Sequence, residues 1–198
     1  IHTYETVEEV QRKGELFTMI TTDRFGEKKQ YQTPHVVIAT GYYDQPNWLD
    51  VPGEDLPKVS HYFKDAHPYI GMKVAVIGAK NSAVDAALEL ERVGADVTVV
   101  YRGSRVPDSV KAWVRPLFES ALRKERIKIL WNANVSQIKD KSIVIDQNGQ
   151  TYELENDFVF ALTGYRPNQT LLEQMGVKFN DETGAPVFDE ATMETHIP

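Results

Sequence analysis

The sequence has 198 residues, of which 41% are hydrophobic and 26% charged, a balance that is typical of globular proteins and excludes a disordered chain. Its 29 acidic residues outnumber its 22 basic ones, and the net charge of −7 argues against non-specific binding to nucleic acid or to an anionic membrane. Cysteine is absent, which excludes disulfides, thiolate metal sites and cysteine nucleophiles within this sequence and is consistent with a reducing compartment, the cytoplasm. No apolar run approaches the roughly 20 residues of a transmembrane helix.

The first third of the sequence predicts strands followed by a long connection. Residues 16–22 and 29–33 are rich in β-branched and apolar side chains and flank a turn, which predicts two paired strands. Residues 35–39 are almost wholly apolar, which predicts a strand buried on both faces. Residues 41–57 contain three prolines and two glycines, and we interpret them as a linker.

A βαβ unit follows. Residues 73–77 form a short apolar run that predicts a buried strand, and residues 96–101 predict a second. Between them, the apolar positions of residues 81–93 recur at helical spacing, with Asn81 or Ser82 available as the N-cap. Such a unit joins two parallel strands through a right-handed crossover.

The remaining pattern predicts a helix and five strands. A helix over residues 107–125 contains Pro116, which either kinks it or shortens its start. The Asn148-Gly149 pair predicts a type I′ hairpin turn within a β-meander. The predicted strands are residues 127–131, 134–138, 142–146, 150–153 and 158–162.

The turn of the βαβ unit carries the main chemical motif. Residues 78–83 read GAKNSA, which matches the dinucleotide fingerprint G-x-G-x-x-G/A except that Lys80 replaces the second glycine. The helix N-terminus offers N–H groups to a pyrophosphate, and Lys80 either obstructs that group or reaches it with its ammonium. A strand-turn-helix without a ligand is the alternative. We predict an α/β, Rossmann-like NAD(P)-binding domain, with its nucleotide held by Gly78, Ala79, Lys80, Asn81 and Ser82.

The residues after the second strand of the unit predict which nucleotide binds. An NAD site places a carboxylate there, which accepts a hydrogen bond from the ribose 2′-hydroxyl. Residues 101–105 instead supply Arg102, Ser104 and Arg105, and Lys111 follows. Because arginine can pair with a phosphate through two hydrogen bonds, this cluster predicts NADPH. The alternative is that these charges are solvated loop residues.

Two further segments share a pattern. Residues 36–41 read VVIATG and residues 159–164 read VFALTG, and each is an apolar run that ends in Thr-Gly. Such an ending leaves backbone N–H groups and no bulky side chain where a cofactor can lie close. We therefore add Thr40, Gly41 and Gly164 to the predicted cofactor-binding residues.

Together, these residues resemble the two-dinucleotide flavoprotein disulfide reductases, and among them the thioredoxin-reductase-like group. The resemblance covers essentially the whole sequence and implies residues 1–45 as part of an FAD-binding domain, residues 46–164 as an NADPH-binding domain and residues 165–198 as a returning FAD-binding segment. Because the sequence begins with Ile1 rather than Met and ends without a closing element, we interpret it as a domain cut from a longer protein.

Within that group, the sequence is most similar to the bacillithiol disulfide reductases of bacilli and staphylococci, and Lys80 fits their pattern. The segments that carry this similarity are residues 61–90, 101–116 and 157–168. The resemblance implies a cytoplasmic, homo-oligomeric whole enzyme that passes a hydride from NADPH to FAD and reduces a small-molecule disulfide. It places no catalytic residue and no metal in this chain, which we expect to be inactive by itself.

Other functions stay open at this point. A thioredoxin reductase carries C-x-x-C where residues 61–64 read HYFK, so its dithiol route is excluded. A ferredoxin–NADP reductase of the same fold and a non-catalytic NADPH-binding module are the alternatives. His61 is either a general acid or, as we favour, a hydrogen-bonded connector residue, and the same holds for His67. Hinges between the domains are expected at Gly41, Gly53 and Gly164.

Overall fold

The computed structural model describes residues 1–197. Its internal contacts divide the chain into two compact units. Unit 1 combines residues 1–44 with the chain from residue 167 onward, and unit 2 comprises residues 45–166. Within residues 1–197, none of the helices has the length and apolar character that crossing a bilayer requires.

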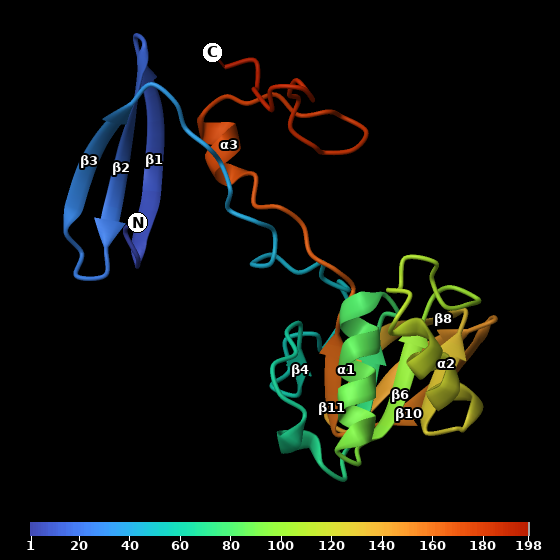
Figure 1. The fold of residues 1–198 in the computed structure, drawn as a ribbon. Coiled ribbons are helices and arrows are strands. Elements are labelled where there is room, and N and C mark those ends of the chain that lie inside the picture. The colour runs from blue at the N-terminus through green and yellow to red at the C-terminus, as the bar shows by residue number, and fades with distance from the viewer. Residues whose placement is uncertain (198) are drawn as a thin grey trace. The chain divides into compact units, whose positions relative to one another are not determined.

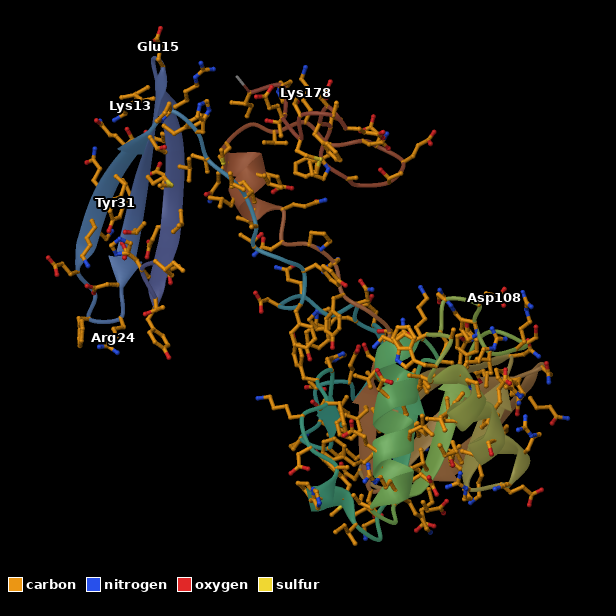
Figure 2. All side chains as sticks on the ribbon, in the orientation of Figure 1. Lys13, Glu15, Arg24, Tyr31, Asp108 and Lys178 are labelled. Atoms are coloured by element: carbon orange, nitrogen blue, oxygen red, sulfur yellow. The ribbon has the colours of Figure 1, made fainter. Side chains whose placement is uncertain are left out.

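Unit 1 contains a three-stranded antiparallel sheet and a short helix (Figure 1). Its elements are β1 (Glu5–Lys13), β2 (Leu16–Asp23), β3 (Lys28–Thr33) and α3 (Thr170–Gln174). The hydroxyl of Tyr31, labelled in Figure 2, donates a 2.9 Å hydrogen bond to the carboxylate of Glu5, to which Thr21 also donates. The bonds from Thr21 and Tyr31 lower the pKa of Glu5 and stabilise its charged form within the sheet.

The predicted buried strand at residues 35–39 is wrong. Residues 35–41 have no regular secondary structure, and the side chain of Val37 is 88% exposed. An apolar run becomes a buried strand only where neighbouring strands pair with it and other layers cover it. None of the strands in the described part of the chain pairs with this segment.

Unit 2 is built around a five-stranded parallel sheet with the strand order β4-β11-β5-β6-β7. The strands are β4 (Val59–Ser60), β5 (Lys73–Ile77), β6 (Asp96–Tyr101), β7 (Ile127–Trp131) and β11 (Phe158–Ala161). Four of them lie where the sequence places them, which confirms the α/β fold class with a parallel sheet. The two-residue strand β4 gave no sequence signal.

Two layers cover this sheet, as Figure 1 shows. Helices α1 (Asn81–Arg92) and α2 (Arg115–Arg123) lie on one face. An antiparallel meander of β8 (Ala133–Ile138), β9 (Ser142–Gln147) and β10 (Gln150–Glu155) lies on the other. Val74 and Val76 of β5 pack in the cluster on the helix side. Ala75 and Ile77 pack in the cluster on the meander side. Because successive residues of a strand face opposite ways and both faces are covered, the four apolar residues 74–77 of β5 are what this position requires.

Local signals explain where these elements start and turn. Helix α1 matches the predicted helix, whereas α2 begins only at Arg115, with Pro116 in its first turn. The predicted shortening by Pro116 is therefore confirmed, and residues 107–114 form turns and irregular chain. Asn148 and Gly149 have φ values of 50° and 80°, as a type I′ turn requires. A 3₁₀ turn at His67–Tyr69 precedes β5.

The two connections that lead out of unit 2 pair with each other at its boundary. The N–H of Asn47 donates to the carbonyl of Gly164 at 2.9 Å, and the N–H of Arg166 donates to the carbonyl of Gln45 at 2.8 Å. Pro46 and Tyr165 form an antiparallel bridge between these bonds. Each connection is thus held by the other before it leaves the unit.

Gly53 does not act as the predicted hinge. It lies inside unit 2, where an added Cβ would come within 2.0 Å of the carbonyl oxygen of Ile138. The neighbouring carbonyl of Pro52 accepts a 2.8 Å hydrogen bond from the N–H of Ile138. Gly53 is therefore a close-packing residue against β8. Gly41 and Gly164 lie nearer the unit boundary and stay predictions.

Candidate nucleotide-binding site

The carboxyl edge of the parallel sheet contains the point at which the strand order reverses. β5 has β6 on one side and β11 on the other, and ligands of open α/β sheets bind at such a point. The N–H of Gly78, directly after β5, donates to the carbonyl of Val100 at 2.9 Å, and the N–H of Leu162 donates to the carbonyl of Ile77 at 2.9 Å. Gly78 therefore lies between the ends of β6 and β11.

Only glycine fits at Gly78. Its φ is +119°, a conformation that side chains rarely adopt, and an added Cβ would lie 2.5 Å from the carbonyl oxygen of Leu162. The same Cβ would lie 3.5 Å from the Cβ of Ala83, which is 1% exposed. The first and last residues of the fingerprint therefore serve close packing between the strand, the helix and β11.

The helix N-terminus differs from the prediction. Lys80 is the N-cap of α1, and no side chain makes a capping hydrogen bond there, so the expected cap by Asn81 or Ser82 is wrong. Lys80 is exposed, with φ −84° and ψ −174°, an extended conformation that any residue adopts. The second position of this fingerprint therefore does not need glycine for its backbone. Ala79 beside it is buried.

Asn81 uses its side chain to hold a distant loop. Its Oδ1 accepts a 2.9 Å hydrogen bond from the backbone N–H of Lys111, and its Nδ2 donates a 3.2 Å hydrogen bond to the carbonyl of Ser109. Asn81 is the first residue within α1 rather than its N-cap, and its side chain bonds the loop. The loop of residues 102–114, which we call the basic loop, is thereby fastened to the first turn of α1.

Three of the predicted phosphate-binding cations, Arg102, Arg105 and Lys111, lie on the basic loop, and two of these three are paired. Arg105 donates to Asp108 at 2.8 Å, and the ammonium of Lys111 lies 3.6 Å from a carboxylate oxygen of Asp85. Arg102 is exposed and makes no ion pair within residues 1–197. Arg102 is therefore the guanidinium of this cluster that is available to an anion, with the exposed Ser104 two residues away.

The far end of the basic loop is also anchored. Asp108, labelled in Figure 2, lies in this loop and accepts hydrogen bonds from Arg105 and Arg115. Arg115 also donates to Glu119 at 2.8 Å and to the carbonyl of Val106 at 3.4 Å. The bonds to Glu119 and Asp108 raise the pKa of the Arg115 guanidinium, which therefore stays charged.

The two Thr-Gly segments belong to different units. Thr40 and Gly41 lie in unit 1, whereas Gly164 follows β11 in unit 2 and has φ +101°. The hydroxyl of Thr163 donates a 2.7 Å hydrogen bond to the carbonyl of Asn47. The structure thus gathers Gly78, the start of α1, the basic loop and Gly164 in unit 2.

Sequence reasoning missed the residues around His61. The imidazole is buried between the ring of Trp48, 4.5 Å away between centroids, and the carboxylate of Glu54, 3.4 Å from Nε2. The ring nitrogens make no hydrogen bond among the described residues, so the expectation of a hydrogen-bonded connector histidine is wrong for its side chain. Glu54 accepts hydrogen bonds from the N–H groups of Leu49 and Asp50.

No cluster of metal-ligating side chains occurs in the described part of the chain.

A family model described as pyridine nucleotide-disulphide oxidoreductase matches residues 1–198. The chain belongs to this family. Its members carry out redox chemistry, which agrees with the predicted enzyme class, and membership implies a nicotinamide cofactor and a flavin.

Three relatives place the chain within the pyridine nucleotide-disulphide oxidoreductases. A Bacillus subtilis (strain 168) protein named bacilliredoxin reductase Bdr is 51% identical over 171 residues, which are 86% of this chain and 53% of the relative. Structures of bacillithiol disulfide reductase Bdr from Bacillus cereus and Staphylococcus aureus match with TM-scores of 0.94 and 0.92 at 48% and 43% identity. They cover 98% and 99% of this chain, and 60% of each solved chain is matched.

These matches confirm the resemblance to the thioredoxin-reductase-like flavoprotein fold and to the bacillithiol disulfide reductases. The chain spans between about half and three fifths of the length of these relatives. What the relatives bind and reduce as whole proteins therefore belongs to the proposal below.

Proposed function

We propose that unit 2 binds NADPH at the carboxyl edge of its parallel sheet and that the whole protein uses it, through FAD, to reduce a disulfide. The observation that carries the choice of NADPH is the position of Arg102. It follows β6 directly, and β6 pairs in parallel with β5, so that Val100 lies opposite Ile77. An unpaired guanidinium thus directly follows β6, the neighbour of the strand that ends at the Gly78 turn, where the 2′-substituent of the ribose lies in this fold.

The residues of unit 2 have distinct tasks in this proposal. The first turn of α1 and the ammonium of Lys80 bind the pyrophosphate, while Arg102 and Ser104 bind the 2′-phosphate. NADPH supplies a hydride and FAD accepts it. The protein contributes position and electrostatics, because it must hold the nicotinamide at reacting distance from the flavin.

The domain assignment is part of the proposal. We assign residues 46–164 to NADPH binding, and the compact unit of residues 45–166 supports that assignment. We assign residues 1–45 and 165–198 to FAD binding, with Thr40 and Gly41 beside the flavin nucleotide. Within unit 2, Gly164 lies at the boundary between these two roles.

Two disulfides are candidate substrates. The solved relatives are described as bacillithiol disulfide reductases, which supports the disulfide of bacillithiol, a small molecule. The Bacillus subtilis relative is instead named for bacilliredoxin, which supports that protein as a second candidate. Comparing the rates of NADPH oxidation by the whole protein with each substrate separates these two candidates.

We further propose a cytoplasmic location and a homo-oligomeric whole enzyme.

Replacing Arg102 with alanine tests the cofactor assignment. We expect Arg102→Ala to weaken NADP⁺ binding by about 1.5–3 kcal/mol, more than tenfold in Kd, because it removes charge-assisted hydrogen bonds to the 2′-phosphate. NAD⁺ binding should change little, since NAD⁺ lacks that phosphate. Titration calorimetry with both oxidised nucleotides measures the two effects without turnover.

A matched control separates this effect from a general loss of positive charge. Arg92 is an exposed arginine in the last turn of α1, at the opposite end of the helix from Gly78. Arg92→Ala should leave the binding of both nucleotides unchanged. Equal losses of NADP⁺ and NAD⁺ affinity in Arg102→Ala would contradict the assignment, as would a wild-type protein that binds NAD⁺ as tightly as NADP⁺.

A further inference from the structure

Apolar and polar contacts together hold the basic loop, because Val106 and Val110 are buried in the helix-side cluster with residues of α1. The carbonyl of Gly103 accepts a 3.0 Å hydrogen bond from the N–H of Asn132 at one end, and Arg115 holds the other end through Asp108 and Val106. Between these ends, Asn81 supplies the two hydrogen bonds described above. These two bonds join residues 109 and 111 of the loop to the first turn of α1, in addition to the apolar contacts.

Asn81 is suited to this tie by the chemistry of its side chain. A primary amide both accepts and donates hydrogen bonds, so one side chain can bond an N–H group and a carbonyl group of the same loop. The N–H of Lys111 and the carbonyl of Ser109 are the two groups it meets. The ammonium of Lys111 also lies near Asp85, four residues after Asn81 and on the same face of α1. Both Asn81 and Asp85 thus hold the loop at Lys111.

We propose that Asn81 is a positioning residue for NADPH specificity. Together with the buried Val106 and Val110, it holds the basic loop against α1, so that the loop beyond Arg102 is already ordered when Arg102 and Ser104 bind the 2′-phosphate. This inference rests on the proposed NADPH function. A loop that must be ordered during binding weakens affinity, and a loop that is ordered beforehand avoids that loss.

The alternative role for Asn81 is direct contact with the nucleotide, as its place in the fingerprint suggests. The two roles differ in which nucleotide they affect. A direct contact with the pyrophosphate acts on NADP⁺ and NAD⁺ alike, because both contain that group. Positioning of the basic loop acts on NADP⁺, because the loop meets the 2′-phosphate that only NADP⁺ has.

The test is calorimetric titration of the whole flavin-loaded protein with NADP⁺ and with NAD⁺. We expect Asn81→Ala to weaken NADP⁺ binding roughly tenfold, the effect of about two lost hydrogen bonds, and NAD⁺ binding less than twofold. In the Arg102→Ala background the same change should weaken NADP⁺ binding less than threefold, because the loop no longer presents that guanidinium. Asn81→Ser, whose hydroxyl is too short to span both loop groups, provides a second variant if the alanine variant does not fold.

Asn180 provides the matched control. In unit 1 its Oδ1 accepts hydrogen bonds from the N–H groups of Glu182 and Thr183, both at 2.9 Å, so Asn180→Ala removes a comparable tie between side chain and loop. It should leave both affinities unchanged. Equal weakening of NADP⁺ and NAD⁺ by Asn81→Ala, or a full tenfold loss that persists without Arg102, would overturn the positioning role. A wild-type protein without preference for NADP⁺ would instead overturn the NADPH proposal.

Discussion

Replacing Gly78 with alanine is expected to destabilise unit 2 and to abolish nucleotide binding at the carboxyl edge of the sheet. Positive φ at a residue with a side chain and close contact with the Leu162 carbonyl each cost about 1–3 kcal/mol, so we expect a total of about 2–6 kcal/mol. The Leu162 carbonyl has little room to retreat, because the N–H of the same residue is bonded to Ile77. Thermal unfolding measures the loss of stability, and NADP⁺ titration measures the loss of binding.

Gly94 supplies the matched control for this experiment. It ends α1 in the same unit with φ +92°, and an added Cβ would meet nothing within 4 Å. Gly94→Ala therefore carries the backbone strain alone, about 1–3 kcal/mol, and should leave NADP⁺ binding intact. If the two variants lose the same stability, contact with Leu162 is not the reason that Gly78 must be glycine.

The parts of the fold that the sequence predicts are those with local causes. The alternation from β5 through α1 to β6 follows from apolar periodicity, and the Asn148-Gly149 turn follows from two residues that tolerate positive φ. Pro116 predicts a boundary because its ring removes a helical hydrogen bond. Each of these signals lies within the element that it specifies.

The failures have non-local causes. Residues 35–39 have the composition of a buried strand, but burial depends on partner strands that the pattern of one segment does not reveal. β1 was missed for the opposite reason, because its largely polar sequence becomes a strand through pairing with β2. In both segments, the presence or absence of a neighbouring strand decides whether the residues form a strand.

The residues of the candidate site also fall into those with a local sequence signal and those whose contacts are distant in the sequence. The fingerprint residues Gly78 and Ala83 are readable from sequence because their spacing reflects one turn of the chain. The side-chain bonds of Asn81 reach residues 28 and 30 positions away, which no local pattern indicates. The pairing of His61 with Glu54 and Trp48 is similarly invisible until the connection folds onto itself. The sequence thus indicates the turn and the helix of the candidate site, but not the side-chain contacts that hold them in place.

Lys80 shows how the structure resolves a departure from the family fingerprint. The second glycine of the motif is usually explained by the close approach of the backbone to the pyrophosphate. Here the backbone of Lys80 is extended and its side chain is exposed, so lysine introduces no strain. An ammonium at the N-cap of α1 adds positive charge to the positive end of the helix dipole, which is unfavourable by itself and becomes favourable once an anion is bound there. This electrostatic balance supports an anionic ligand at the site.

The 198-residue chain is expected to bind NADPH and yet to reduce no disulfide. Reduction of a disulfide requires a thiolate or another group that attacks sulfur, and this sequence contains no cysteine. Hydride transfer also requires the nicotinamide and the flavin within about 3–3.5 Å of each other, a geometry that unit 2 cannot provide by itself. We therefore expect NADPH oxidation in the presence of bacillithiol disulfide and added FAD to stay at the uncatalysed rate.

The measurement follows NADPH absorbance over time, with calorimetry under the same conditions as proof that the nucleotide is bound. The longer protein that contains this chain should oxidise NADPH with the same disulfide, and Arg102→Ala should raise its KM for NADPH more than it lowers kcat, since the 2′-phosphate lies far from the hydride. Disulfide reduction by the cysteine-free chain above the uncatalysed rate would contradict the proposal that unit 2 only binds NADPH, because electrons would then reach sulfur without a thiol. Binding without turnover assigns unit 2 the task of holding NADPH and leaves the sulfur chemistry to residues outside this sequence.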